Sequence, residues 1–251
     1  MTSAKRNGCC KAISVVYGRA ADIMMALQYD IQQEKDFSYK GLSTDEIISH
    51  IVDFVTLLWQ NHPFREGNTR TTAVFVIKYL RSIGFKVDND LFANNSWYFR
   101  NALVRANYRN PSKGIEPNKS FLIRFFRNLM LGEHHELKNR YMLIGYSDTD
   151  EPHTSTHTST HTSFDETAST LSENIKRLLV AIGTDEKSVK EIMEAVGLKN
   201  RPNFLEYSLT PAIIEGLVKM KYPNSPRHPR QKYLLTVKGL ATYNELEKAV
   251  R

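Results

Sequence analysis

Apolar residues recur every third or fourth position through most of the chain, with short polar breaks between the repeats. This spacing is typical of amphipathic helices. In the first part of the chain it predicts helices over residues 18–35, 44–61, 68–83, 96–108 and 118–131. The first 147 residues are therefore predicted to be mainly α.

The second half of the chain shows another pattern. Three helical segments are followed by two short runs that are typical of strands, with a loop of three prolines between the runs. This order is the one found in a winged helix-turn-helix domain. Pro211 is expected to bend or divide the third helix. The segments are helices 173–182, 189–196 and 203–218, and strands 217–222 and 232–237.

Residues 148–168 separate the two parts and include the repeat HTSTHTSTHTS, which offers no apolar side chain to bury. We interpret this stretch as a flexible linker. Metal binding by His153, His157 and His161 is the alternative, which would require a helix. The predicted domains are 1–147, the linker 148–168, and 169–251.

Composition narrows the function classes. The formal net charge of +7 favours polyanionic partners, although solubility alone explains it as well. No apolar run is long enough to cross a bilayer, and no signal peptide is evident. The only two cysteines, Cys9 and Cys10, are adjacent and fit neither a disulfide framework nor a metal site. We therefore expect a cytoplasmic protein.

The stretch from His62 to Thr72 (HPFREGNTRTT) has the residue types of a phosphate-binding site. Pro63 disfavours helix in the residue before it, so His62 is predicted on the loop between two helices. A glycine permits a tight turn, the first amides of the next helix point outward, and Arg70 adds donors for phosphate oxygens. Glu66 is a candidate ligand for a divalent cation, and His62 a candidate base.

This stretch resembles the motif of the Fic (filamentation induced by cAMP) family, H-x-F-x-[D/E]-G-N-G-R-x-x-R. The resemblance extends more weakly from about residue 14 to 140, and it implies a Fic helical core with a small β-hairpin flap near 12–17. Some Fic proteins carry a winged-helix extension like the one predicted after the linker. Within the motif the matching residues are His62, Phe64, Glu66, Gly67, Asn68 and Arg70.

The resemblance implies a protein adenylyltransferase that moves AMP from ATP to a Ser, Thr or Tyr hydroxyl of a target protein, including itself. By this resemblance His62 is the base, Glu66 holds Mg²⁺, and Phe64 packs into the core. Gly67, Asn68 and Thr69 form an anion hole through backbone amides and the Asn side chain, and Arg70 clamps phosphate. The alternative function is a nucleotide-sensing regulator that binds DNA or protein and whose Fic core is not catalytic. The sequence leaves open whether the protein forms a homo-oligomer.

The sequence departs from the family pattern twice. Thr69 stands where the family has its third glycine, which a helix start tolerates if φ is negative. Ala73 stands where the family has a second arginine, to which the resemblance assigns the γ-phosphate. The sequence offers Arg65, Arg100 and Arg105 as substitutes and does not choose among them.

Further site residues follow from the resemblance. Val16 and Tyr17 are expected in the flap that aligns the target by strand addition. Ser169 and Glu173 match the family's inhibitory pattern [S/T]-x-x-x-E-[G/N]; the alternative is that they belong to an ordinary helix start.

Two further groups have two interpretations each. The residues Tyr98, Asn101 and Arg105 share a helix face, which is either the adenine pocket or an ordinary buried face. The cations of the basic hairpin, Arg227, Arg230 and Lys232, are candidates for contact with DNA phosphates. A purely structural or protein-docking module is the alternative for that domain.

Overall fold

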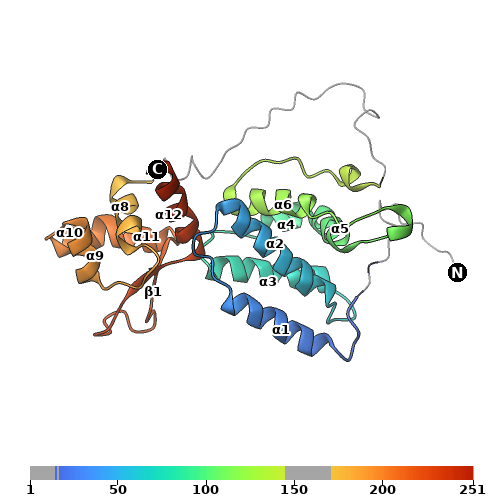
Figure 1. The fold of residues 1–251 in the computed structure, drawn as a ribbon, viewed down its shortest axis with the longest axis horizontal. Coiled ribbons are helices and arrows are strands. Elements are labelled where there is room, and N and C mark those ends of the chain that lie inside the picture. Colours follow the sequence, from blue (N-terminus) through green and yellow to red (C-terminus); the bar gives the residue numbers. More distant parts are fainter. Residues whose placement is uncertain (1–14, 16, 145–170, 251) are drawn as a thin grey trace, which may run out of the picture. The chain divides into compact units, whose positions relative to one another are not determined.

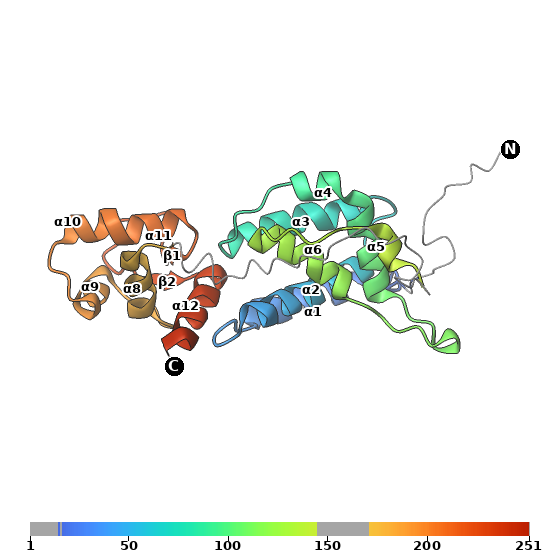
Figure 2. The same ribbon diagram turned by 90° about the horizontal axis from the view of Figure 1, so that it is seen from above.

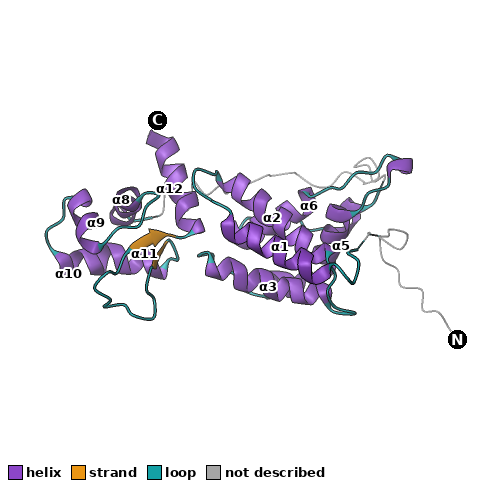
Figure 3. Ribbon diagram, turned by 60° about the horizontal axis from the view of Figure 1, so that its bottom comes forward, coloured by secondary structure: helices purple, strands orange, loops and turns teal. Residues whose placement is uncertain are grey.

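The computed structural model describes residues 15, 17–144 and 171–250 of the chain. Within this part the protein is mainly helical, with one two-stranded antiparallel sheet (Figure 3). The predicted mainly α class is therefore confirmed. The predicted linker, both domain boundaries and the predicted flap, apart from Val15 and Tyr17, lie outside the described residues. None of the described helices is long and apolar enough to cross a membrane.

The chain divides into two compact units. The first comprises residues 1–37, 48–76 and 88–161. The second comprises 38–47, 77–87 and 162–251, so it takes in the beginning of one N-terminal helix and the end of another. Both units are therefore continuous in space but assembled from separate segments of sequence.

The helices of the N-terminal half are joined by loops, of which the one between α5 and α6 is the longest (Figure 1). They are α1 (Ile23–Asp36), α2 (Thr44–Gln60), α3 (Asn68–Ser82), α4 (Asp90–Asn94), α5 (Ser96–Asn107) and α6 (Ser120–Leu131), with 3₁₀ turns η1 (Pro111–Lys113) and η2 (Asn139–Met142).

Predicted and observed helices agree closely for α2, α3, α5 and α6, whereas α1 begins five residues later than predicted and α4 was not predicted. The Gly18 amide donates to the carbonyl of Gln60 at the end of α2, which holds the preceding chain in place before a turn at Asp22. The start of α2 is fixed by a capping box. Ser43 Oγ accepts from the Glu46 amide, and the Glu46 carboxylate accepts from the Ser43 amide at 2.7 Å.

The core of the first unit lies between α2, α5 and α6. Ile51 and Val55 of α2 are fully buried, and rings from α4, α5 and α6 pack against each other at centroid distances of about 5 Å. Edge-on and tilted ring pairs of this kind are favourable beyond their area. These rings belong to Phe92, Phe99 and Phe125. Figure 2 shows α4 beside α3. Residues of both helices line a cavity that is described below.

The C-terminal half contains α8 (Glu173–Ile182), α9 (Val189–Val196) and a long helical segment broken into α10 (Arg201–Phe204), the π turn η4 (Leu205–Leu209) and α11 (Thr210–Ile214). Strand β1 (Val218–Met220) pairs antiparallel with β2 (Tyr233–Leu235), and α12 (Val237–Val250) follows. The predicted division of the third helix near Pro211 is confirmed. Sequence spacing did not predict α12.

Two close backbone approaches hold the second unit together. A Cβ on Gly84 would lie 2.2 Å from the carbonyl oxygen of Gly216, and a Cβ on Gly239 would lie 2.0 Å from that of Leu217. Only glycine fits at such distances. The missed helix α12 therefore contains, in its first turn, a residue type that disfavours helices, because tertiary packing requires glycine there.

Candidate functional site

The imidazole of His62 is held at the end of α2 by the backbone itself. Its Nδ1 lies 2.8 Å from the carbonyl oxygen of Trp59, and the His62 amide donates to the same oxygen at 3.2 Å. Its φ is +47°, the only positive value outside glycine among the described residues. A non-glycine residue in this region is strained, which is typical of residues held for function.

The contact with Trp59 fixes the tautomer of His62. A carbonyl oxygen can only accept a hydrogen bond, so Nδ1 carries the proton and Nε2 keeps its lone pair. Burial lowers the pKa of His62 below its usual 6.5; the bond to Trp59 raises it, and the charge of Arg100 lowers it further. At neutral pH the ring is therefore uncharged, with Nε2 available as a base.

The ring of Tyr17 lies against His62, at a centroid distance of 3.8 Å and an interplanar angle of 40°. The Trp59 ring packs edge-on against both of these rings, with centroid distances of 4.8 Å to His62 and 5.8 Å to Tyr17. Burial raises the pKa of Tyr17 and Arg100 opposes the rise, so its hydroxyl is neutral at physiological pH. Tyr17, predicted in the flap, thus contacts the predicted base. Val16 lies outside the described residues.

The loop after His62 is closed by the side chain of Asn68. Asn68 Oδ1 accepts from the Phe64 amide at 2.9 Å, and Asn68 Nδ2 donates to the Phe64 carbonyl at 2.6 Å. Both ends of this amide are thus used, so the side chain braces the loop. Nδ2 keeps a second hydrogen to donate, and the part of Asn68 in an anion hole stays a prediction.

The same bracing corrects the prediction for Phe64. Its side chain is 52% exposed and does not pack into the core, because the loop turns its ring outward. There it borders a small apolar pocket of about 140 Å³ together with Leu27 and Ile31 of α1.

The start of α3 has the features of an anion site. Gly67 turns the chain with φ +79°, and the first amides of the helix have no acceptor within it. A Cβ on Gly67 would lie 3.9 Å from Arg70 Nη2, so the guanidinium folds back toward the turn. Thr69 has a negative φ, as the predicted tolerance requires, and its hydroxyl accepts from Trp59 Nε1 at 3.1 Å.

A cavity of about 330 Å³ adjoins this helix start. Thr69, Arg70 and Ala73 of α3 form one side, and Phe92 and Phe99 are among the residues of α4 and α5 that form the other. Its volume is within the range of small-molecule sites. Ala73, where the family has an arginine, adds no charge to this side of the cavity.

The residues predicted for an adenine pocket are not at this cavity. Tyr98 is 2% exposed and donates to the Phe121 carbonyl, and burial raises its pKa to about 12. Asn101 is buried and donates to Asn139 Oδ1. Arg105 is also buried, with Nε and Nη1 unpaired within the described chain. The shared face therefore packs inward, and the opposite face of α5, with Ser96 and Phe99, meets the cavity.

The structure separates the three arginines that could replace the missing one. The charge of Arg100 acts on both His62 and Tyr17, and its guanidinium lies 5.9 Å from the Trp97 ring. Arg105 is buried in the helix packing, and Arg65 is exposed on the loop. Arg100 is therefore the one that the fold brings to the base.

Glu66 is exposed on the loop between His62 and Gly67. The described residues hold no cluster of three His, Cys, Asp or Glu side chains that could bind a metal by themselves. Mg²⁺ is commonly held by one or two carboxylates together with substrate phosphates, which is the arrangement that a single Glu66 fits.

Among the predicted inhibitory residues, Ser169 lies outside the described part of the chain. Glu173 is the first residue of α8, after Ser172 at the N-cap position, and its carboxylate lies 3.7 Å from Arg177 Nε on the same helix. This is the geometry of the helix-start alternative. An inhibitory role for Glu173 stays a hypothesis.

The predicted DNA-contact residues lie in or beside the loop between β1 and β2. Arg227 and Arg230 are exposed, and Lys232 is half-buried. The element that would read bases is interrupted by η4, and its exposed side chains include Glu206 and Tyr207. Contact with DNA stays a prediction.

Trp59 is the site residue that sequence reasoning missed. Its backbone carbonyl orients His62 and its indole binds Thr69, so it links the base to the start of α3. The available signal was its position three residues before His62, the spacing at which a helix carbonyl is reached from the following loop.

Together the fold and the loop define a mainly helical protein with a histidine, an acidic residue and a glycine turn at one helix start. Residues 5–80 match the sequence model of the Fic/DOC family. Residues 173–236 match that of the filamentation induced by cAMP protein Fic-like, C-terminal domain. The chain therefore has a Fic/DOC family domain followed by a Fic-like C-terminal domain, which confirms the resemblance.

A solved structure that aligns with the chain is a Fic family protein from Desulfovibrio desulfuricans G20. The two are 18% identical, the alignment covers 88% of this chain and 57% of that chain, and the TM-score is 0.29. This chain thus spans little more than half of that protein's length. A comparison with curated proteins found no match.

Proposed function

We propose that this protein is an adenylyltransferase that moves AMP from ATP to a hydroxyl side chain of a protein. The observation that carries the proposal is the Nδ1 contact of His62 with the Trp59 carbonyl. It leaves Nε2 unprotonated beside a helix start whose free amides and Arg70 suit phosphate. An orienting group of this kind is what a general base requires.

In the proposed reaction His62 Nε2 takes the proton of the target hydroxyl. The hydroxyl oxygen forms a bond to the α-phosphorus of ATP while the bond from that phosphorus to the oxygen bridging to the β-phosphate breaks. Pyrophosphate leaves with the electron pair of that bond. The amides at the start of α3, with Arg70, would stabilise the charge on the phosphate oxygens.

Glu66 is the residue proposed to hold Mg²⁺, with the remaining ligands coming from the phosphates of ATP and water. When bound, the ion would neutralise charge on the phosphates. Arg100 is proposed to take the part of the arginine that Ala73 replaces, because its charge already acts on His62. The adenosine is proposed to enter the cavity beside Ala73, where the aromatic rings of α4 and α5 offer an apolar wall.

The test uses the full chain with Mg²⁺ and ATP labelled on the α- or on the γ-phosphate in parallel, with and without cell lysate. We expect α-label alone on protein, because transfer of AMP keeps only the α-phosphorus. His62→Ala should lower labelling by about 10²- to 10⁴-fold, the usual contribution of a general base. His134→Ala is the matched control, since His134 is exposed and lies outside the site.

Three outcomes would overturn the proposal. Equal labelling in His62→Ala would remove the assigned base. Label from γ-labelled ATP alone would indicate phosphoryl transfer instead. Nucleotide binding with no labelling under any condition would favour the alternative, a Fic domain that senses nucleotide without turnover.

A further inference from the structure

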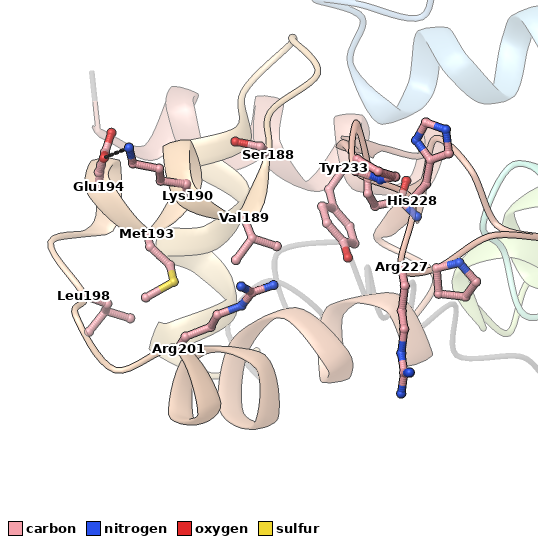
Figure 4. Close-up of a pocket in the computed structure, with 13 residues that line it drawn as sticks. Ser188, Val189, Lys190, Met193, Glu194, Leu198, Arg201, Arg227, His228 and Tyr233 are labelled. Atoms are coloured by element: carbon pink, nitrogen blue, oxygen red, sulfur yellow. Dashed lines mark ion pairs between the residues drawn. The ribbon is translucent and has the colours of Figure 1, made fainter.

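A groove in the second unit lies far in sequence from the His62 loop and has no part in the proposed reaction. Its volume is about 660 Å³, and it is bordered by α9, the start of α10 and the loop between the two strands (Figure 4). About half of its surface is apolar, contributed by side chains such as Val189, Met193 and Leu198. Leu198 is 42% exposed, so its side chain is accessible to a ligand in the groove.

Two arginines on different elements flank this groove. Arg201 begins α10, and Arg227 is in the loop between the strands. Both are exposed, and neither forms an ion pair within the described part of the chain. In Figure 4 the side chain of Tyr233 lies between them. Burial raises the pKa of Tyr233 and Arg201 opposes the rise, so the hydroxyl is a neutral donor near the guanidinium. Lys190, by contrast, pairs with Glu194 at 3.9 Å.

Both sides of the groove are held rigidly. On the loop side, Gln231 bonds the Tyr222 backbone in both directions, at 2.9 and 3.0 Å, and the Tyr222 ring lies 4.1 Å from that of His228. On the helix side, the Leu198 amide donates to the Met193 carbonyl after the left-handed Gly197, so the turn leading to Arg201 is closed. A preformed groove loses little conformational entropy on binding.

We propose that this groove binds a protein segment in which acidic and apolar side chains alternate. Carboxylates of the segment would pair with Arg201 and Arg227, which match carboxylate geometry with two donors each. An apolar side chain would lie on Met193 and Leu198. The partner is another protein, so the C-terminal domain acts as a docking module.

The groove fits nucleic acid less well. A phosphate backbone needs a series of free cations and gains nothing from an apolar floor. Here Lys190, which lines the groove, pairs with Glu194, and Lys221 of the same domain pairs with Glu186. Glu194 also lines the groove, where its charge would repel phosphates.

The experiment measures binding of a short fluorescent peptide of alternating aspartate and leucine to the full chain, by anisotropy. Peptides with asparagine for aspartate, or glycine for leucine, are the ligand controls. We expect the double variant Arg201→Glu, Arg227→Glu to bind at least about tenfold more weakly, equivalent to about 1.4 kcal/mol. Leu198→Ser tests the apolar contact and should also weaken binding.

Lys219→Glu is the control for a reversed charge outside the groove, because Lys219 is exposed on β1 and does not line the groove; each single variant, Arg201→Glu and Arg227→Glu, matches it in charge. Lys219→Glu should bind the peptide as the unchanged chain does, and circular dichroism should show all variants folded. The proposal fails if the peptide shows no saturable binding, or if Lys219→Glu weakens binding as much as the double variant. It also fails if a random DNA duplex binds with steep salt dependence through the two arginines while the peptide does not.

Discussion

The indole N–H of Trp59 donates to the hydroxyl of Thr69 at 3.1 Å, which joins the end of α2 to the start of α3. Trp59 is 2% exposed, and its carbonyl orients His62. The threonine that departs from the family pattern thus has a structural role. It provides the acceptor that a buried indole needs, at the position where glycine would provide none.

Removing that acceptor should destabilise the protein. Thr69→Val leaves the Trp59 N–H unpaired, and we expect the free energy of unfolding to fall by about 1–3 kcal/mol. Thr69→Ser keeps a hydroxyl and should lose clearly less. Urea unfolding followed by circular dichroism measures both. A loss in Thr69→Ser as large as that in Thr69→Val would contradict a dominant role for the hydrogen bond, because the serine variant keeps the hydroxyl.

The contact between Tyr17 and His62 should be visible in the titration of the imidazole. Tyr17→Ala uncovers His62, so the pKa of His62 should rise toward its usual 6.5. Tyr17→Phe keeps the ring and should keep the pKa low. NMR titration of the imidazole protons measures this without any enzyme assay. An unchanged pKa in Tyr17→Ala would contradict the contact.

The pH dependence of labelling should follow the protonation of His62. Only the neutral ring is a base, and its pKa lies below 6.5, so the rate should stay level through neutrality and fall only in more acid solution. Arg100→Gln removes a charge that lowers this pKa, so the acid limb should move to higher pH. If the limb stays in place, Arg100 is not close enough to act on the base.

Arg109→Gln is the matched control for Arg100. Arg109 pairs with Glu116 at the surface, so its loss should leave the pH profile unchanged. The proposed phosphate contact predicts in addition that Arg100→Gln raises the KM for ATP. A change in stability alone would move neither quantity in this manner.

The approach of Gly84 to Gly216 should make the second unit sensitive to a single methyl group. Gly84→Ala places a Cβ against the Gly216 carbonyl at φ +104°, and we expect a loss of about 2–5 kcal/mol from strain and overlap together. Gly41→Ala has a similar φ of +77° but open space, so it should cost only about 1–2 kcal/mol. Urea unfolding distinguishes the two; equal losses would show that the backbone contact is unimportant.

The sequence by itself predicted most helices, the strand pair and the loop that carries His62. These features follow from local rules: apolar spacing sets the helices, Pro63 ends α2, and a glycine allows the turn at Gly67. The motif also predicted the family, because its residue types recur at fixed spacing. All of this information is contained in short stretches of chain.

Only the tertiary structure showed which helix faces are buried and which distant segments are in contact. The periodicity of α5 placed Tyr98, Asn101 and Arg105 on one face but could not say that this face is buried and the opposite one meets the cavity. It also missed α12, whose Gly239 is required by a neighbour remote in sequence. Burial and contact depend on segments that meet only after folding, and for that reason the partners of His62 at Trp59, Tyr17 and Arg100 had to be read from the structure.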